Sequence, residues 1–103
     1  QGALAVNTSS SDILARQQGN LLTNIGHTHV NAKKFAESEK IFREVTTRFP
    51  DAMHGYFGLG KMYQEQGKPK EAIPYFENSV LVDASATPYV FYRLGKAWNS
   101  LGE

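Results

Sequence analysis

Apolar residues recur at helical spacing in several stretches of the chain, and short breaks separate these stretches. This spacing places the apolar side chains on one face of an α-helix, so the sequence predicts helices. In the middle of the chain, Pro50-Asp51 forms such a break and offers an N-cap, and a helix is predicted over residues 53–66. Gly67 then suits a left-handed C-terminal turn, and Pro69 suits the first turn of a second helix.

The second helix of this pair carries a single apolar stripe, formed by Ala72, Ile73, Phe76 and Val80. Pro74 lies one turn inside it and has no N–H, so we expect a slight bend there. The same pattern predicts helices over residues 20–30, 34–49 and 87–101, with Thr87 as the cap of the last. The predicted helices therefore follow one another as antiparallel pairs, and each pair forms one unit of the chain.

The chain contains an internal repeat with glycine in the middle of three predicted helices. The aligned segments are residues 25–29, 59–63 and 94–98, which carry Gly26, Gly60 and Gly95 at the same place. The steps between these glycines are 34 and 35 residues, and the extra residue lies in 83–86. A glycine inside a helix costs about 1 kcal/mol relative to alanine. We therefore expect a neighbouring helix to cross close to each of the three glycines.

The middle unit shows the repeat most fully, as a pattern of large–x–x–Leu–Gly–x–x–Tyr followed by Gly, Ala and Phe. Its residues are Tyr56, Leu59, Gly60, Tyr63, Gly67, Ala72 and Phe76. This pattern resembles the tetratricopeptide repeat. The first unit departs from it, with His29 where tyrosine is usual and Ser38 where alanine is usual. The resemblance implies an all-α fold in which helical hairpins form a right-handed superhelix of about two and a half repeats.

The domain organisation follows from the same alignment. We expect a tetratricopeptide domain over residues 12–103, with units near 19–52 and 53–87 and a truncated unit over 88–103. Residues 1–11 are rich in Ser, Thr and Asn and predict a flexible N-terminal segment.

Residues 12–18 fit either a short extra helix capped by Ser11 or a backward extension of the first repeat helix. The chain begins at Gln1 without a signal-peptide pattern, so we expect it to belong to a longer protein.

Composition narrows the classes of partner. Eleven Lys and Arg against ten Asp and Glu give a net charge of +1, which argues against nucleic acid and acidic membranes as partners and against the RNA-binding pentatricopeptide family. The absence of cysteine excludes disulfides and thiolate catalysis but leaves the compartment open. No apolar run reaches the roughly 18–20 residues of a membrane-spanning helix. We expect a soluble protein, with the cytoplasm slightly favoured.

Enzyme signatures are missing from the sequence, which has no nucleophile elbow, phosphate loop or metalloprotease spacing. His27 and His29 stand two positions apart on a helix, so they point to different faces and cannot chelate one metal together. A metal site formed by His27 and His54 has no visible third ligand. We expect a chain that is not an enzyme and that carries no cofactor and no metal.

The resemblance implies that the first helix of each pair lines a concave groove. The groove candidates are Asn20, Thr23, Asn24, His27, His54, Phe57, Lys61, Gln64, Tyr89, Tyr92, Arg93, Lys96 and Asn99. Aromatic side chains interleaved with cations and amides suit a peptide with acidic and apolar side chains. Arg93 suits a carboxylate, and Tyr92 and Phe57 suit an apolar anchor. We therefore interpret the chain as a scaffold for protein–protein interaction that binds a peptide or protein segment in this groove. The alternative is that it is an oligomerisation or spacer segment of a larger protein that can include a catalytic domain.

One subclass of the family can be compared residue by residue. Tetratricopeptide domains that grip the carboxyl-terminal tail of heat-shock chaperones use a clamp of Lys, Asn, Asn, Lys and Arg. The matching positions here hold Thr23, His27, Gly58, Tyr89 and Arg93. Only Arg93 agrees, which argues against a chaperone-tail adaptor.

The last predicted helix lacks a partner helix in the sequence given. Phe91, Leu94, Trp98 and Leu101 would each have one uncovered side, and terminal repeats normally carry a polar outer face. Exposed apolar patches of this kind usually mark an interface. We therefore hypothesise that the chain self-associates through its uncovered terminal helices.

Overall fold

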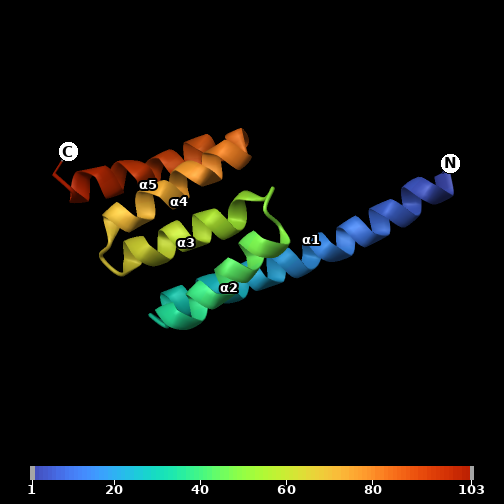
Figure 1. Ribbon diagram of the computed structural model, residues 1–103, viewed down its shortest axis with the longest axis horizontal. Helices are drawn as coiled ribbons and strands as arrows, with labels where there is room; N and C mark the ends of the chain where they lie inside the picture. The colour runs from blue at the N-terminus through green and yellow to red at the C-terminus, as the bar shows by residue number, and fades with distance from the viewer. Residues whose placement is uncertain (1, 103) are drawn as a thin grey trace.

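A chain of antiparallel α-helices forms the structure, a computed structural model that describes residues 2–102, with side chains described for Ser11 and from Ile13 onward (Figure 1). In order, the elements are α1 (Gly2–Asn31), α2 (Phe35–Arg48), α3 (Met53–Glu65), α4 (Pro69–Val82), the short 3-10 helix η1 (Ala84–Ala86) and α5 (Thr87–Ser100). The described residues contain no strand. The predicted all-α fold is confirmed.

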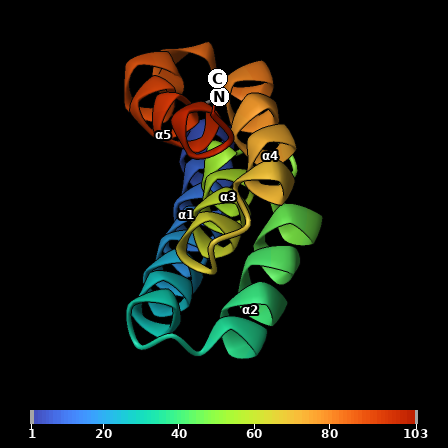
Figure 2. The same cartoon turned by 90° about the vertical axis from the view of Figure 1, so that its left-hand side faces the viewer.

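The helices form two layers. Seen from the end, α1, α3 and α5 lie along one side of the molecule, and α2 and α4 lie along the other (Figure 2). The first helix of each pair thus belongs to one layer and the second helix to the other. The predicted bounds of α2, α3 and α5 agree with the structure to within one residue at each end.

The N-terminal part of the chain differs from the prediction. Residues 2–11, expected to be flexible, are helical and belong to α1, which also continues through residues 12–18 as the backward extension allowed by the sequence. Extending an existing helix costs far less than starting one, and residues 3–5 are the strong helix formers Ala, Leu and Ala. The N-terminal half of α1 projects beyond the other helices (Figure 1), so the molecule is elongated, 56 × 27 × 17 Å.

Two predicted helix caps are also wrong. Ala52, with an extended backbone, stands at the N-cap of α3 in place of Asp51. Thr87 is the first residue of α5 rather than its cap, and its hydroxyl donates a hydrogen bond to the Ala84 carbonyl at 2.6 Å. In both cases a neighbouring turn already orients the chain: η1 leads directly into α5, so the cap position falls on Ala86.

Left-handed residues follow three of the helices at equivalent places: Lys33 after α1, Gly67 after α3 and Gly102 after α5. Gly67 has φ +78° after α3, as predicted, and the Lys68 N–H donates to the Tyr63 carbonyl at 2.9 Å. Lys33 takes the same place after α1 with φ +62°, and the Lys34 N–H donates to the His29 carbonyl at 2.8 Å. Glycine adopts this conformation without the steric cost that a Cβ brings, so Lys33 holds local strain that Gly67 does not.

Phenylalanines at equivalent positions fill the core. Phe42 packs with Val30, Leu59 and Met62 between α1, α2 and α3, and Phe76 belongs to a larger cluster between α3, α4 and α5. Both phenylalanine side chains are fully buried. The two clusters give each successive pair of helices its own core, as expected for a repeat protein.

The mid-helix glycines allow these rings to approach the helices. A Cβ at Gly26 would lie 2.7 Å from the Phe42 ring, and a Cβ at Gly60 would lie 2.7 Å from the Phe76 ring. The predicted close crossing is therefore confirmed at these two positions. It is wrong at Gly95, where a Cβ would meet nothing within 4 Å, because no described helix packs on that side of α5.

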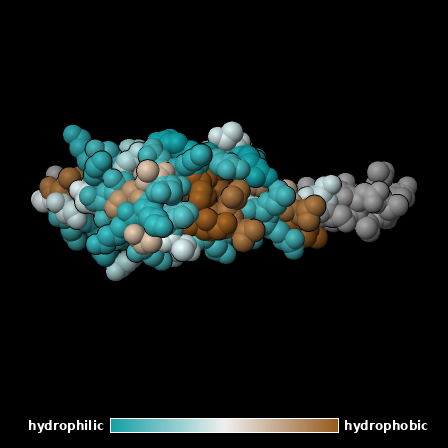
Figure 3. Space-filling view, turned by 90° about the horizontal axis from the view of Figure 1, so that it is seen from below, coloured by the Kyte–Doolittle hydropathy of each residue, from teal (hydrophilic) through white to brown (hydrophobic). Residues whose placement is uncertain are grey.

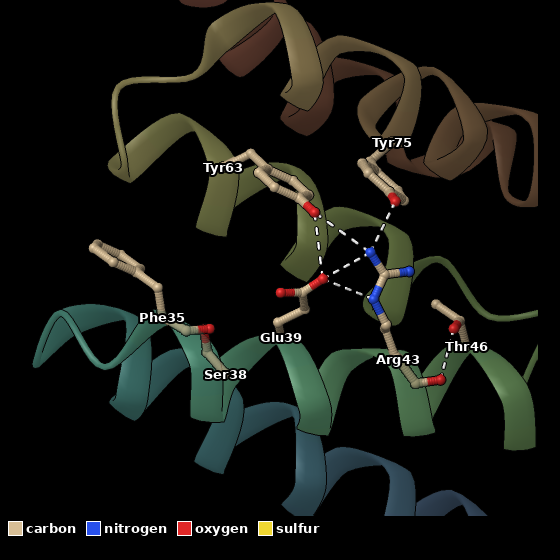
Figure 4. A network of polar contacts seen from close by, with 7 residues as sticks. All are labelled: Phe35, Ser38, Glu39, Arg43, Thr46, Tyr63 and Tyr75. Carbon is tan, nitrogen blue, oxygen red and sulfur yellow. Dashed lines mark hydrogen bonds and ion pairs between the residues drawn. The ribbon is translucent and has the colours of Figure 1, made fainter.

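A polar network joins α2, α3 and α4 on another side of the molecule (Figure 4). The Arg43 guanidinium donates to Glu39 at 2.9 Å and to the hydroxyls of Tyr63 and Tyr75, each at 3.4 Å. The two tyrosine rings stack with centroids 5.6 Å apart. Because its members come from three consecutive helices, this network links the first hairpin to the second at the surface, beside the buried contact of Phe42 with Leu59 and Met62.

Apolar side chains are also exposed at both ends of the helix array. Figure 3 shows an apolar area on the face formed by α1 and α2, and the large exposed apolar residues of α1 are Ile13, Leu14, Leu21 and Ile25. Ile25 is exposed although its repeat equivalent, Leu59, is buried, because α2 covers Leu59 and no described helix covers Ile25. Four residues at the C-terminal end of the chain were expected to be uncovered, and of these Phe91 and Trp98 of α5 and Leu101 just after it are exposed. Leu94 is buried in the core, contrary to the prediction.

Candidate binding groove

A cavity of about 630 Å³ opens on the α1–α3–α5 layer. Its lining comes from α1, α3, η1 and the first turn of α5, and consists of Asn20, Thr23, Asn24, His27, Met53, His54, Phe57, Asp83, Ser85, Ala86 and Tyr89. The α1 wall is polar, and the opposite side combines the aromatic rings of Phe57 and Tyr89 with polar groups of the turn between α4 and α5. The cavity thus offers hydrogen-bonding groups and apolar surface to the same ligand.

Two stacked rings form the aromatic side. Phe57 is 4 % exposed, and its ring lies 4.8 Å from that of Tyr89, with 24° between the planes. The buried Phe76 lies behind Phe57 at 5.6 Å and holds it in place. Tyr89 is 64 % exposed, so it presents an aromatic surface to solvent at the mouth of the cavity while its inner side rests on a fixed ring.

His27 stands on the α1 wall opposite these rings. Its ring meets Phe42 edge-on at 5.0 Å and Phe57 at 6.3 Å. Burial, followed by the charges of Lys61, Arg93 and His54, lowers the pKa of His27 to about 4. His27 is therefore a neutral imidazole near pH 7, so it can serve a ligand as a hydrogen-bond partner but not as a cation.

Two polar atoms on the α1 wall have no hydrogen-bond partner among the described residues, namely Thr23 Oγ1 and His27 Nδ1. Thr23 is 7 % exposed. A buried polar atom without a partner costs about 1–3 kcal/mol. A ligand group that reached either atom after a small side-chain rotation would recover part of that cost.

Two cationic side chains lie beside the cavity, between α3 and α5. Burial, and then the charge of Arg93, lowers the pKa of Lys61. Arg93 donates to Gln64 Oε1 at 2.9 Å and to Glu65 at 3.4 Å, and Gln64 Nε2 donates to the Arg93 carbonyl at 3.0 Å. Gln64 and Arg93, both groove candidates, are thus partly engaged with each other, whereas Lys61 forms no ion pair with any side chain that the structure describes.

The structure places the thirteen sequence candidates in three groups. Those that line the cavity are Asn20, Thr23, Asn24, His27, His54, Phe57 and Tyr89. Those that lie beside it are Lys61, Gln64 and Arg93. Those on α5 outside it are Tyr92, Lys96 and Asn99, and of these Lys96 lies over the Tyr92 ring at 5.5 Å rather than toward the cavity.

Four lining residues were not among the sequence candidates. Met53 opens α3, and Asp83, Ser85 and Ala86 belong to the turn between α4 and α5. Asp83 accepts hydrogen bonds from the Ser85 N–H at 3.1 Å and from the Ser85 hydroxyl at 2.6 Å, which holds this turn closed. The 35-residue step was the available signal, because the extra residue falls within 83–86.

A second cavity, of about 690 Å³, continues the groove along α1. It shares Asn20, Thr23 and His54 with the first cavity and extends to the turn between α2 and α3. Charged residues of both signs line it, including Arg16, Arg48 and Asp51. The two cavities together form an elongated groove along α1, a shape that suits an extended segment better than a compact small molecule.

Among the side chains that the structure describes, no three His, Asp or Glu residues gather closely enough to hold a metal ion. Within residues 2–102, no helix is both long enough and apolar enough to cross a membrane.

A comparison with protein families agrees with the repeat pattern. A family model described as tetratricopeptide repeat matches residues 19–51 and 54–85, well over half of the chain. No curated protein matches the chain.

Proposed function

The chain belongs to the tetratricopeptide repeat family, and from this membership we propose that it binds an extended peptide or protein segment in the groove along α1, α3 and α5. Tetratricopeptide repeats generally mediate protein–protein interaction and are typically non-enzymatic scaffolds. The partner is then a protein, and the chain acts by binding it and carries out no catalytic step.

The stacked Phe57–Tyr89 pair is the observation that carries this proposal. Phe57 is fixed by the core, and Tyr89 offers most of its ring to solvent beside a cavity of about 630 Å³. Rigid aromatic side chains at the edge of a pocket are the usual anchors of a protein interface, since burying them releases water and orders few rotamers. An apolar or aromatic side chain of the partner occupies this place.

Charge around the anchor supports a partner that also carries a carboxylate. Lys61 lies near the cavity with its pKa lowered by burial and by Arg93, so two cations share this corner. Glu65 balances Arg93 only in part, at 3.4 Å. A ligand carboxylate close to Lys61 would reduce the repulsion between the two cations.

The experiment is selection of short random peptides displayed on phage against the purified chain, followed by titration of the selected peptides. Tyr89→Ala removes the outer ring of the anchor. We expect it to weaken binding of selected peptides by at least about tenfold, as truncation of an interface anchor does. Phe91→Ala is the matched control, because Phe91 is on the same helix and is 62 % exposed against 64 % for Tyr89.

Lys61→Met tests the electrostatic part of the proposal. It keeps the length of the side chain and removes the charge, so peptides with a carboxylate should lose affinity while neutral peptides keep theirs. Selected peptides that bind Tyr89→Ala and the unchanged chain equally would refute the groove as the binding surface.

A further inference from the structure

One face of α5 differs from the equivalent faces of α1 and α3. The rings of Phe42 and Phe76 pack within 2.7 Å of where a Cβ would stand on Gly26 and Gly60, whereas Gly95 has nothing within 4 Å. Figure 2 shows α5 at the outer edge of its layer. Gly95 thus forms an open notch of the kind that receives a phenylalanine ring elsewhere in the same chain.

The surface around this notch is uncharged, with apolar residues at its centre and polar residues at its two ends. Since a helix turns once in about 3.6 residues, six residues share this side of α5, and we call them the α5 stripe: Thr87, Pro88, Phe91, Gly95, Trp98 and Asn99. Phe91 is 62 % exposed and Trp98 is 43 % exposed. None of the six is charged, and Arg93 and Lys96 lie on other sides of the helix. A second α5 stripe could therefore approach without bringing like charges together.

We propose that the α5 stripe is covered by the α5 stripe of a second copy of this chain, in antiparallel orientation. Of the chain's six phenylalanines, all of them described, only Phe91 is exposed. A two-fold axis beside residue 93 places Phe91 of each copy in the Gly95 notch of the other. One symmetry operation thereby fills both notches.

The same register matches the rest of the stripe. It places Trp98 against Pro88 of the second copy, and Thr87 against Asn99 of the second copy, where hydroxyl and amide can form a hydrogen bond. Residue 93 is also the middle of α5 (Thr87–Ser100), so this register overlaps the whole helix with its copy. Glycine at residue 95 lets the two helices approach closely, as small residues do at helix crossings.

The geometry also sets the size and strength of the assembly. A contact in which the same surface meets itself about a two-fold axis closes at two copies. A single pair of helices of this length buries less area than a standard stable interface, so the dimer is weak and depends on concentration. Tyr89 and the groove lie on another side of α5, so dimerisation leaves the proposed peptide-binding surface free.

The first test is sedimentation equilibrium over a range of protein concentrations. We expect a mass that rises from one chain to two and no further. Phe91→Ala should raise the dissociation constant by at least about tenfold, whereas Tyr89→Ala, which removes an equally exposed ring outside the stripe, should leave it unchanged. A peptide selected for the groove should still bind Phe91→Ala, which separates this proposal from the proposed function.

A second variant guards against loss of folding. Gly95→Leu fills the notch, and it should not disturb the single chain because nothing lies within 4 Å and leucine favours helix more than glycine does. We expect a thermal midpoint at least equal to that of the unchanged chain, together with loss of the dimer.

Cross-linking tests the register, since the chain has no cysteine of its own. A mixture of Thr87→Cys and Asn99→Cys chains should form the mixed disulfide in preference to either homodimer under mild oxidation. A mass of one chain at every concentration would overturn the proposal, and so would growth beyond two copies, as a head-to-tail contact of α5 with α1 would produce. It would also be overturned if Tyr89→Ala weakened the dimer as much as Phe91→Ala does, or if Thr87→Cys homodimers formed in preference to the mixed disulfide.

Discussion

Alanine at Gly60 and alanine at Gly95 should change stability in opposite directions, although both glycines occupy the same repeat position. In a helix interior, glycine is about 1 kcal/mol less favourable than alanine, so both substitutions gain the same amount from propensity. At Gly95 the new methyl group meets nothing within 4 Å. We therefore expect Gly95→Ala to raise the free energy of unfolding by about 1 kcal/mol.

At Gly60 the same methyl group would lie 2.7 Å from two atoms of the Phe76 ring. Phe76 is fully buried, and the Phe57 ring lies on it at 5.6 Å, so the ring has little room to retreat. Overpacking of this kind costs about 1–3 kcal/mol and occasionally more. The net effect of Gly60→Ala is a loss of up to about 2 kcal/mol.

The difference between the two variants isolates the packing cost, because the propensity gain cancels. Thermal unfolding followed by far-UV circular dichroism measures it, at concentrations low enough to keep the chain as a single copy. For a domain of this size, 1 kcal/mol corresponds to a midpoint shift of roughly 4–8 °C. Equal shifts for the two variants would refute the conclusion that Phe76 limits the space at Gly60.

Three further predictions concern pH, strain and the inter-hairpin network. Folding lowers the pKa of His27 from 6.5 to about 4, so the unfolded state binds more protons between these pH values. The free energy of unfolding should therefore fall by about 1–2 kcal/mol as pH drops through that window, after allowance for partial solvent screening. Denaturant titrations should show this fall in the unchanged chain and not in His27→Gln, and parallel curves of stability against pH would contradict it. Lys33→Gly should stabilise the chain by about 0.5–1 kcal/mol, since it relieves the steric strain of a left-handed backbone at φ +62°. Lys34→Gly, at an ordinary φ, is the control and should not raise the midpoint of thermal unfolding. Arg43→Met should lower the free energy of unfolding by at most about 1 kcal/mol. This loss should shrink in roughly 1 M salt because the Arg43 side chain is half exposed. A loss that does not depend on salt would assign the effect to packing.

If the groove and the α5 stripe both act as proposed, one short chain carries two separate interaction surfaces on the same helix. Tyr89 would serve the peptide partner, and Phe91, two residues further along, would serve the second copy. A dimer of this kind would present two grooves, and a partner with two binding segments would gain affinity from binding both at once. The paired variants Tyr89→Ala and Phe91→Ala can test each surface without removing the other.

The helices and the repeat could be read from the sequence because their signals are local. Pro69 and Gly67 mark the turn between α3 and α4 through their own backbone preferences, and the apolar period marks the buried faces. The caps at Asp51 and Thr87 were predicted wrongly because a suitable side chain does not decide where a helix starts when the preceding turn already orients the backbone. Residues 2–11 were predicted wrongly because composition describes an isolated segment, whereas these residues extend an existing helix.

Tertiary structure alone decided how repeat-equivalent residues differ. Gly60 and Gly95 carry the same sequence signal, yet Phe76 faces one and nothing described faces the other. Leu59 and Ile25 likewise share a repeat position and differ in burial. The turn at 83–86 lines the cavity because the packing of α4 and α5 places it opposite α1. No local sequence pattern encodes this placement. Sequence specified the helices through short-range preferences, and long-range packing determined which of their faces meet.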